Sequence, residues 1–220
     1  MTISSKLTAK PLRSALAGAL LLAVPAVPLV MAAPASAQGD QLDQAVAALR
    51  AITTMQADFV QTDRNGQSVR GVMTLKQGGK IRFEYEKAAK MLIVSNGRTL
   101  TVADYEVNDF KRYPIGNSPL GALLNPSKDV KRYGRLVPTA NPNVISIAVK
   151  DPGKPEYGEM TLIMIKKAGA PGGLELNSWV ARDAQNKLTT VRLSNQRYGV
   201  PAPDSLFTYV DTSRKLGPQH

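Results

Sequence analysis

The chain has 220 residues, with 28 basic and 17 acidic side chains, no cysteine and a formal net charge of +11. The lack of cysteine excludes disulfides, a thiol nucleophile and thiolate metal ligands. The only histidine is His220, at the end of the sequence, so neither a Ser-His-Asp or Cys-His catalytic arrangement nor a histidine-rich metal site can be built. No glycine-rich phosphate loop is present in the sequence.

The first 37 residues have the three-part pattern of a secretory signal. The basic residues at its start are Lys6, Lys10 and Arg13. An apolar stretch over residues 15–30 follows, and Ala35-Ser36-Ala37 then offers the small residues that signal peptidase accepts before Gln38. A membrane anchor is the alternative, but prolines interrupt the apolar run, which is short for a span. We therefore predict that residues 1–37 are removed on export.

The remaining residues, 38–220, are predicted to form one domain that is long enough to bury a sizeable core. They keep 25 basic and 17 acidic residues, which gives a net charge of +8. Outside the cytoplasm, anionic lipid headgroups and acidic protein surfaces replace nucleic acid as partners for a basic surface. A basic surface that serves solubility alone is the alternative.

A helix is predicted at the start of this domain, with Asp40 as its N-cap. Leu42, Val46, Leu49 and then Ile52 or Thr53 recur at spacings of three and four residues and form one apolar stripe. An isolated helix of this length is marginal in water, so the stripe must pack against another element.

After about Met55 the pattern changes to strands separated by turns such as Asn65-Gly66, Gly78-Gly79 and Asn96-Gly97. Residues 80–86 alternate strictly between apolar and charged side chains, as in a half-buried antiparallel strand. The other predicted strands include residues 92–94, 100–102, 144–149, 160–165, 174–181, 188–198 and 206–210. About ten strands without crossover helices indicate an antiparallel sheet, sandwich or barrel.

A short helix is predicted to interrupt the strands between Ser118 and Pro126. Its apolar face consists of Leu120, Leu123 and Leu124. This face is either a lid over a cavity or an ordinary core plug at one end of a barrel.

Five stretches occur in a fixed order behind the signal: residues 55–62 (MQADFVQT), 79–85 (GKIRFEY), 92–100 (LIVSNGRTL), 118–124 (SPLGALL) and 206–209 (LFTY). Together they resemble the outer-membrane lipoprotein carrier protein (LolA) family over most of residues 40–210. The resemblance implies a mainly β fold: an unclosed antiparallel β-barrel of ten or eleven strands, with an N-terminal helix and a short helical lid over an apolar cavity. It implies a periplasmic chaperone, not an enzyme, without cofactor or metal.

The resemblance also implies the partners. They are acylated lipoproteins, an inner-membrane ABC exporter that loads the carrier, and an outer-membrane receptor of similar fold. That receptor is itself a lipoprotein, so a chain without cysteine looks like the free carrier. We expect a monomer that binds no nucleic acid.

Strand alternation supplies the candidate cavity lining: Ile81, Phe83, Tyr85, Leu92, Val94, Leu100, Val102, Ile145, Ile147 and Met164. Methionines such as Met91, Met160 and Met164 suit adaptable walls, although they are equally common as core fillers. The sequence departs from the family in one turn, where many members have an Arg-Pro pair whose arginine holds the lid closed. Gln77 and Gly78 stand there, and a neutral amide makes a weaker contact.

Two other function classes stay open beside the carrier. One is a periplasmic binder of another lipid, such as a glycolipid, and the other is an envelope-stress sensing module on the same fold. An enzyme is the weakest alternative, because its carboxylate candidates, Asp104, Glu106 and Asp109, have the pattern of solvated turn residues.

Overall fold

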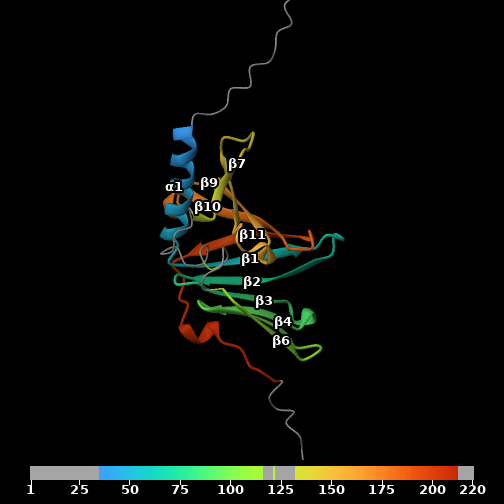
Figure 1. Ribbon diagram of the computed structural model, residues 1–220. Coiled ribbons are helices and arrows are strands. Elements are labelled where there is room, and N and C mark those ends of the chain that lie inside the picture. Colours follow the sequence, from blue (N-terminus) through green and yellow to red (C-terminus); the bar gives the residue numbers. More distant parts are fainter. Residues whose placement is uncertain (1–34, 116–120, 122–131, 213–220) are drawn as a thin grey trace, which may run out of the picture. The chain divides into compact units, whose positions relative to one another are not determined.

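The computed structural model describes residues 35–115, 121 and 132–212, all within one compact unit that includes residues 33–220. Its single sheet has eleven antiparallel strands (Figure 1). The strands are β1 (Thr54–Thr62), β2 (Ser68–Lys76), β3 (Lys80–Tyr85), β4 (Met91–Asn96), β5 (Thr99–Asp104), β6 (Asp109–Pro114), β7 (Gly134–Val137), β8 (Val144–Lys150), β9 (Glu159–Lys166), β10 (Leu174–Arg182) and β11 (Leu188–Tyr198). The helix α1 (Ala35–Ala51) precedes them, and the short 3-10 helices are η1 (Lys87–Ala89), η3 (Pro155–Tyr157), η4 (Pro171–Gly173) and η5 (Asp204–Phe207).

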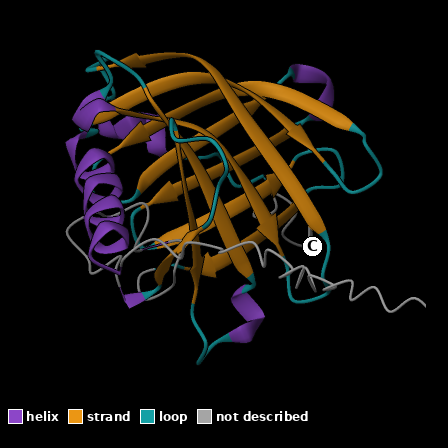
Figure 2. Ribbon diagram, turned by 90° about the horizontal axis from the view of Figure 1, so that it is seen from above, coloured by secondary structure: helices purple, strands orange, loops and turns teal. Residues whose placement is uncertain are grey.

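The sheet consists of two meanders joined by the first and last strands. Its order is β6-β5-β4-β3-β2-β1-β11-β10-β9-β8-β7, so β1 pairs with β11 in the middle and β6 and β7 are the two edges. The sheet is curved, and α1 lies beside its strands (Figure 2). The expected mainly β fold with an unclosed antiparallel sheet and an N-terminal helix is therefore confirmed.

The helix α1 packs its predicted apolar stripe against the sheet. Val46, Leu49 and Ile52 are buried in the main core, and Leu42 packs on them. The predicted N-cap is wrong, because α1 begins at Ala35 and Asp40 lies inside the helix. The stripe residues are buried although the helix begins earlier than predicted. The 3.6-residue period of the helix, and not its first residue, determines which face packs against the sheet.

Two hairpin turns lie against each other at one end of the sheet. Gly78 and Gly79, between β2 and β3, both have positive φ, as does Gly97 between β4 and β5. A Cβ on Gly97 would lie 2.4 Å from the carbonyl oxygen of Gly78, so this contact between backbones requires glycine. The buried Ser95 hydroxyl joins the two turns, because it donates to the Gly79 carbonyl at 2.9 Å and accepts from the Gly97 N–H at 3.0 Å.

Both Asn-Gly pairs predicted as turns lie in turns between strands, and an aspartate or asparagine side chain closes each turn. The loop between β1 and β2 spans residues 63–67, and Asp63 accepts hydrogen bonds from the backbone N–H groups of Asn65 and Gln67. In both Asn-Gly pairs only the glycine has positive φ. Asn96 instead accepts the N–H groups of Arg98 and Thr99 with its side chain. Glycine thus supplies the special backbone angle and the polar side chain closes the turn.

The outer face of the sheet, which is the face turned away from α1, carries a second apolar cluster. Leu92, Val94, Ala103, Ala202 and Phe207 are its buried members. Residues 206–210 were predicted as a strand, and this is wrong: Asp204–Phe207 form η5, and residues 208–212, the last that the structure describes, form no strand. Prolines at 201 and 203 lack the N–H that a strand ladder needs, so the segment covers the face without extending the sheet.

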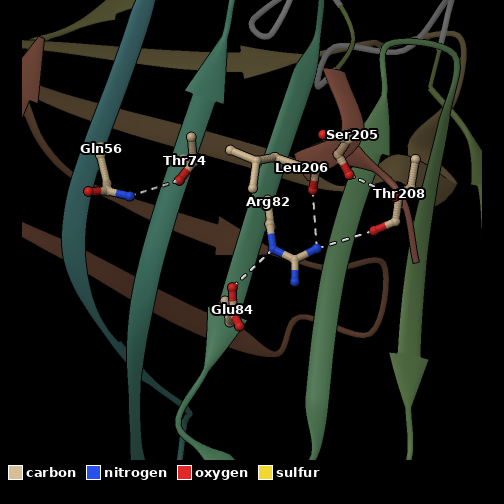
Figure 3. A network of polar contacts seen from close by, with 7 residues as sticks. All are labelled: Gln56, Thr74, Arg82, Glu84, Ser205, Leu206 and Thr208. Carbon is tan, nitrogen blue, oxygen red and sulfur yellow. Dashed lines mark hydrogen bonds and ion pairs between the residues drawn. The ribbon is translucent and has the colours of Figure 1, made fainter. Parts of the chain in front are cut away.

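Cationic side chains hold this C-terminal segment on the outer face. Arg82 donates to the carbonyl oxygens of Leu206 and Thr208, at 3.2 Å each, and pairs with Glu84 (Figure 3). Lys76 and Lys80 both form ion pairs of 2.7 Å with Asp204. The segment is therefore fixed by side chains of β2 and β3 that would otherwise face solvent.

Candidate functional site

An apolar cavity of about 340 Å³ lies on the inner face of the sheet, the face that carries α1. This volume falls within the usual range of ligand-binding pockets. Its lining comes from α1, β1 to β5 and β9 to β11, and consists of Leu49, Gln61, Met73, Leu75, Ile81, Phe83, Tyr85, Ile93, Leu100, Met160, Leu162, Leu176, Trp179, Ala181, Thr189 and Val191. Both halves of the sheet thus contribute to one hollow.

Aromatic rings form one side of the cavity. Phe83 lies edge to face with Phe59, at a centroid distance of 5.3 Å, and with Trp179, at 5.9 Å. Phe59 also meets Tyr85 edge to face at 5.1 Å. Phe59 packs over Gly71, where a Cβ would lie 2.7 Å from its ring. The glycine therefore leaves the space in which the Phe59 ring supports the cavity wall.

Polar side chains are few in the lining. Apart from the indole of Trp179, they are Gln61, Tyr85 and Thr189. The Tyr85 hydroxyl donates to the Gln61 Oε1 at 2.7 Å. Burial raises the pKa of Tyr85 to about 12, so its hydroxyl stays protonated at physiological pH. Such a lining suits a ligand with a long apolar part and little polarity.

Four of the ten side chains predicted to line the cavity do line it: Ile81, Phe83, Tyr85 and Leu100. Ile145, Ile147 and Met164 are instead fully buried in the main core. Val102 has the same parity as Leu100 on β5, and therefore shares its face, but is not part of the lining. Contact of any of these residues with lipid stays a prediction.

The predicted facing of β4 requires a correction. Leu92 and Val94 belong to the outer cluster under the C-terminal segment, and Ile93 between them lines the cavity. The register decides this, because Ile93 pairs with Phe83 and directly paired residues point to the same face. Leu92-Ile93-Val94 is apolar on both faces because both faces of β4 are covered, so alternation carries no signal there.

The predicted lid and its predicted contact residue, Gln77, differ in whether the structure describes them. Leu120, Leu123 and Leu124 lie outside the described residues. Gln77 is exposed at the β2–β3 turn, where its backbone N–H donates to the Thr53 carbonyl at 2.8 Å. The role of Gln77 in lid closure stays a prediction.

The carboxylate cluster has the geometry of a turn. Asp104 accepts the backbone N–H groups of Glu106 and Val107, and Asp109 pairs with Lys111. In the described part of the chain, no group of three or more His, Cys, Asp or Glu side chains is placed to hold a metal ion. None of the helices described there has the length and hydropathy needed to cross a membrane.

Comparison with known proteins identifies one family. The family model described as outer membrane lipoprotein carrier protein LolA matches residues 50–210. An outer-membrane lipoprotein carrier protein of Methylobacillus flagellatus is 26% identical over 198 residues, which cover 86% of this chain and 94% of that protein. Another, of Chromobacterium violaceum, is 27% identical over 200 residues, with 86% and 91% covered.

Solved structures with a similar backbone have lower sequence identity to this chain. A LolA superfamily protein of Nitrosomonas europaea has a TM-score of 0.45 at 13% identity, and the match covers 78% of this chain and 97% of that one. The MucA/MucB complex of Pseudomonas aeruginosa has a TM-score of 0.44 at 16% identity, with 79% and 61% covered.

Proposed function

Because this chain belongs to the LolA family of outer membrane lipoprotein carrier proteins, we propose that it carries lipoproteins through the periplasm, with their acyl chains in the apolar cavity. The observation that carries the proposal is the cavity itself. It is about 340 Å³ in volume, is lined almost wholly by apolar side chains, and draws on both halves of the sheet. In this proposal the cargo passes from the inner to the outer membrane.

The energetics of acyl chains explain why such a carrier needs an apolar interior. Exposure of a chain to water costs about 0.8 kcal/mol per CH₂, which amounts to on the order of 10 kcal/mol for a long chain. Side chains such as Ile81, Leu162 and Leu176 can replace the membrane as the apolar surroundings. Met73 and Met160 in the wall are flexible and polarisable, so they can adapt to chains of different length.

The same cost implies partners at both ends of the transfer. Extraction from a membrane is uphill, so loading requires an energy source, for which we propose an inner-membrane ABC exporter. Unloading requires a receptor of higher affinity, for which we propose an outer-membrane lipoprotein. A carrier that moves between them must be free in the periplasm, and the predicted signal over residues 1–37 provides the export.

Recovery of bound cargo from the native compartment tests the proposal. The protein is isolated from the periplasm, and mass spectrometry identifies the lipids and lipoproteins that accompany it. Ile93→Glu places a charge in the cavity and should abolish cargo recovery. Val72→Glu is the matched control, because Val72 lies on the outer face of β2 and is 39% exposed.

Each result has a definite reading. Acylated lipoproteins recovered with the native chain and with Val72→Glu, but not with Ile93→Glu, support the carrier. A different lipid in the cavity would replace the carrier with a binder of that lipid. A stable protein partner without any lipid would favour a sensing module on the same fold.

A further inference from the structure

The polar side chains of the cavity gather at one end. In the register of β1, Gln61 pairs with Val191 of β11, and Thr189 lies two residues further toward the start of β11. Tyr85 is the last residue of β3 and reaches Gln61 through its hydroxyl. At the opposite end, the lining includes Leu49 of α1 and Leu75, near the end of β2 that leads into the β2–β3 turn. The cavity therefore has one polar and one apolar end along the strands.

The hydrogen bond between Tyr85 and Gln61 fixes which atoms of the amide remain available. The Tyr85 hydroxyl donates to Oε1, and this bond holds the carboxamide in one orientation. The Nε2 group has two N–H donors. Among the described residues, no acceptor for Nε2 of Gln61 is recorded. A donor of this kind in an apolar lining favours a ligand that brings an acceptor with it.

We propose that the Gln61 carboxamide is the polar anchor of the cavity, and that it donates from Nε2 to the carbonyl oxygen through which an acyl chain is linked to its headgroup. This inference rests on the proposed function, since it concerns the same cavity. The chain then lies with its carbonyl at the Gln61 end and its methyl end toward Leu49. Tyr85 acts as a positioning residue that orients the amide.

The anchor gives the cavity a preference that hydrophobicity alone does not. A net hydrogen bond between uncharged groups changes affinity by about three- to tenfold. The carbonyl could belong to an ester or to an amide, because both linkages present the same acceptor. An ether-linked chain of equal length has equal apolar area and lacks the carbonyl.

Three ligands of equal chain length test the anchor on the full mature chain. They are a lysophospholipid with an ester-linked chain, its ether-linked analogue, and a peptide acylated at its amino terminus through an amide. Displacement of a fluorescent apolar probe from the cavity measures their affinities. The native chain should bind the ester about three- to tenfold more tightly than the ether. The acylated peptide tells whether an amide carbonyl is accepted as well.

Variants assign the preference to one side chain. Gln61→Leu should bring the ester-to-ether ratio close to one. Tyr85→Phe should reduce the ratio less, because Nε2 remains but is no longer oriented. Thr189→Val is the matched control at the same end of the cavity and should keep the ratio. Thermal unfolding of each variant confirms that it is folded.

The outcomes separate the anchor from the function it serves. Equal affinity of the native chain for ester and ether overturns the anchor and leaves the carrier proposal standing. An ester-to-ether ratio that falls to one in Thr189→Val but not in Gln61→Leu also overturns the anchor. Failure of all three ligands to displace the probe overturns the proposed function and the anchor together.

Discussion

Phe83 of β3 and Trp179 of β10 meet edge to face, with ring centroids 5.9 Å apart, although three strands separate β3 from β10 in the sheet. Four strand spacings in a flat sheet would place them about 19 Å apart. The contact therefore requires that the sheet curl around its inner face, as Figure 2 shows. This curl brings both halves of the sheet into one cavity.

Trp179 is the only tryptophan and should report on the contents of the cavity. We expect an acyl chain that carries bromine near its methyl end to quench Trp179 fluorescence, because quenching by bromine requires close approach. The measurement is a fluorescence titration of the mature chain.

A moved tryptophan provides the control for that titration. Trp179→Phe combined with Phe110→Trp places the fluorophore in the outer cluster, where Phe110 stacks on Tyr209. Its emission should not change. Equal quenching of both proteins would mean that the chain does not bind in the cavity.

Adjacent residues of β4 should differ in their contact with cargo. A photoreactive diazirine side chain at Ile93 should crosslink to the acyl chain of a bound lipoprotein, since Ile93 lines the cavity. The same side chain at Leu92 points to the outer face and should not. Mass spectrometry of the crosslinked product measures this, and a crosslink from Leu92 alone would reverse the assigned faces.

Regular alternation allowed part of the site to be predicted from sequence. In β3 charged residues separate Ile81, Phe83 and Tyr85, so one face is unambiguous and all three line the cavity. In β10 a bulge lies between Leu176 and Ser178. It places Leu176 and Trp179 on the same face although they are three residues apart, which simple alternation cannot predict.

Contacts between residues that are far apart in the chain explain the parts of the site that the sequence did not predict. The facing of β4 depends on the C-terminal segment, whose Phe207 covers the outer face from more than a hundred residues away. Gln61 looks like an ordinary strand residue until the register places it beside Tyr85. Local patterns reveal strands and turns, whereas the choice of face at doubly covered strands comes from packing.

Gly172→Ala should destabilise the fold more than Gly169→Ala. Both glycines have positive φ, of 62° and 82°, so alanine costs about 1–2 kcal/mol at either position. At Gly172 a Cβ would also lie 2.6 Å from the Cα of Ala48, whereas Gly169 has open space around it. Overpacking against the α1 backbone adds about 1–3 kcal/mol. Urea denaturation of both variants measures the difference, and equal losses would contradict the close packing of η4 on α1.

Processing should leave a chain that begins at Gln38. The positive start, the apolar stretch and Ala35-Ser36-Ala37 together predict cleavage after Ala37. Intact-mass measurement of the protein from the periplasmic fraction checks this. Recovery of the chain in the membrane fraction with residues 1–37 retained would show an anchor instead.

The ion pairs of Asp204 should make the attachment of the C-terminal segment sensitive to acid. Hydrogen bonds from Lys76 and Lys80 lower the pKa of Asp204 from 3.8 to about 2 in the folded chain. A carboxylate with a lowered folded-state pKa stabilises the fold above its unfolded pKa and loses this contribution as the pH falls through the folded value. The contribution of Asp204 should therefore be complete above about pH 4 and disappear between pH 4 and pH 2. Its size should be small and salt-dependent, since the carboxylate is exposed.

Asp204→Asn isolates this contribution. The difference in unfolding free energy between the native chain and Asp204→Asn should be constant from neutral pH to about pH 4, and should shrink toward zero at about pH 2. Urea denaturation across this range measures it. Glu156→Gln is the control, because Glu156 is an exposed acid for which no ion pair is recorded among the described residues. A difference near zero already at neutral pH would contradict the prediction, and would show that the charge of Asp204 does not hold the segment and that the bond from Lys76 to the Ala202 carbonyl, which both proteins keep, is sufficient.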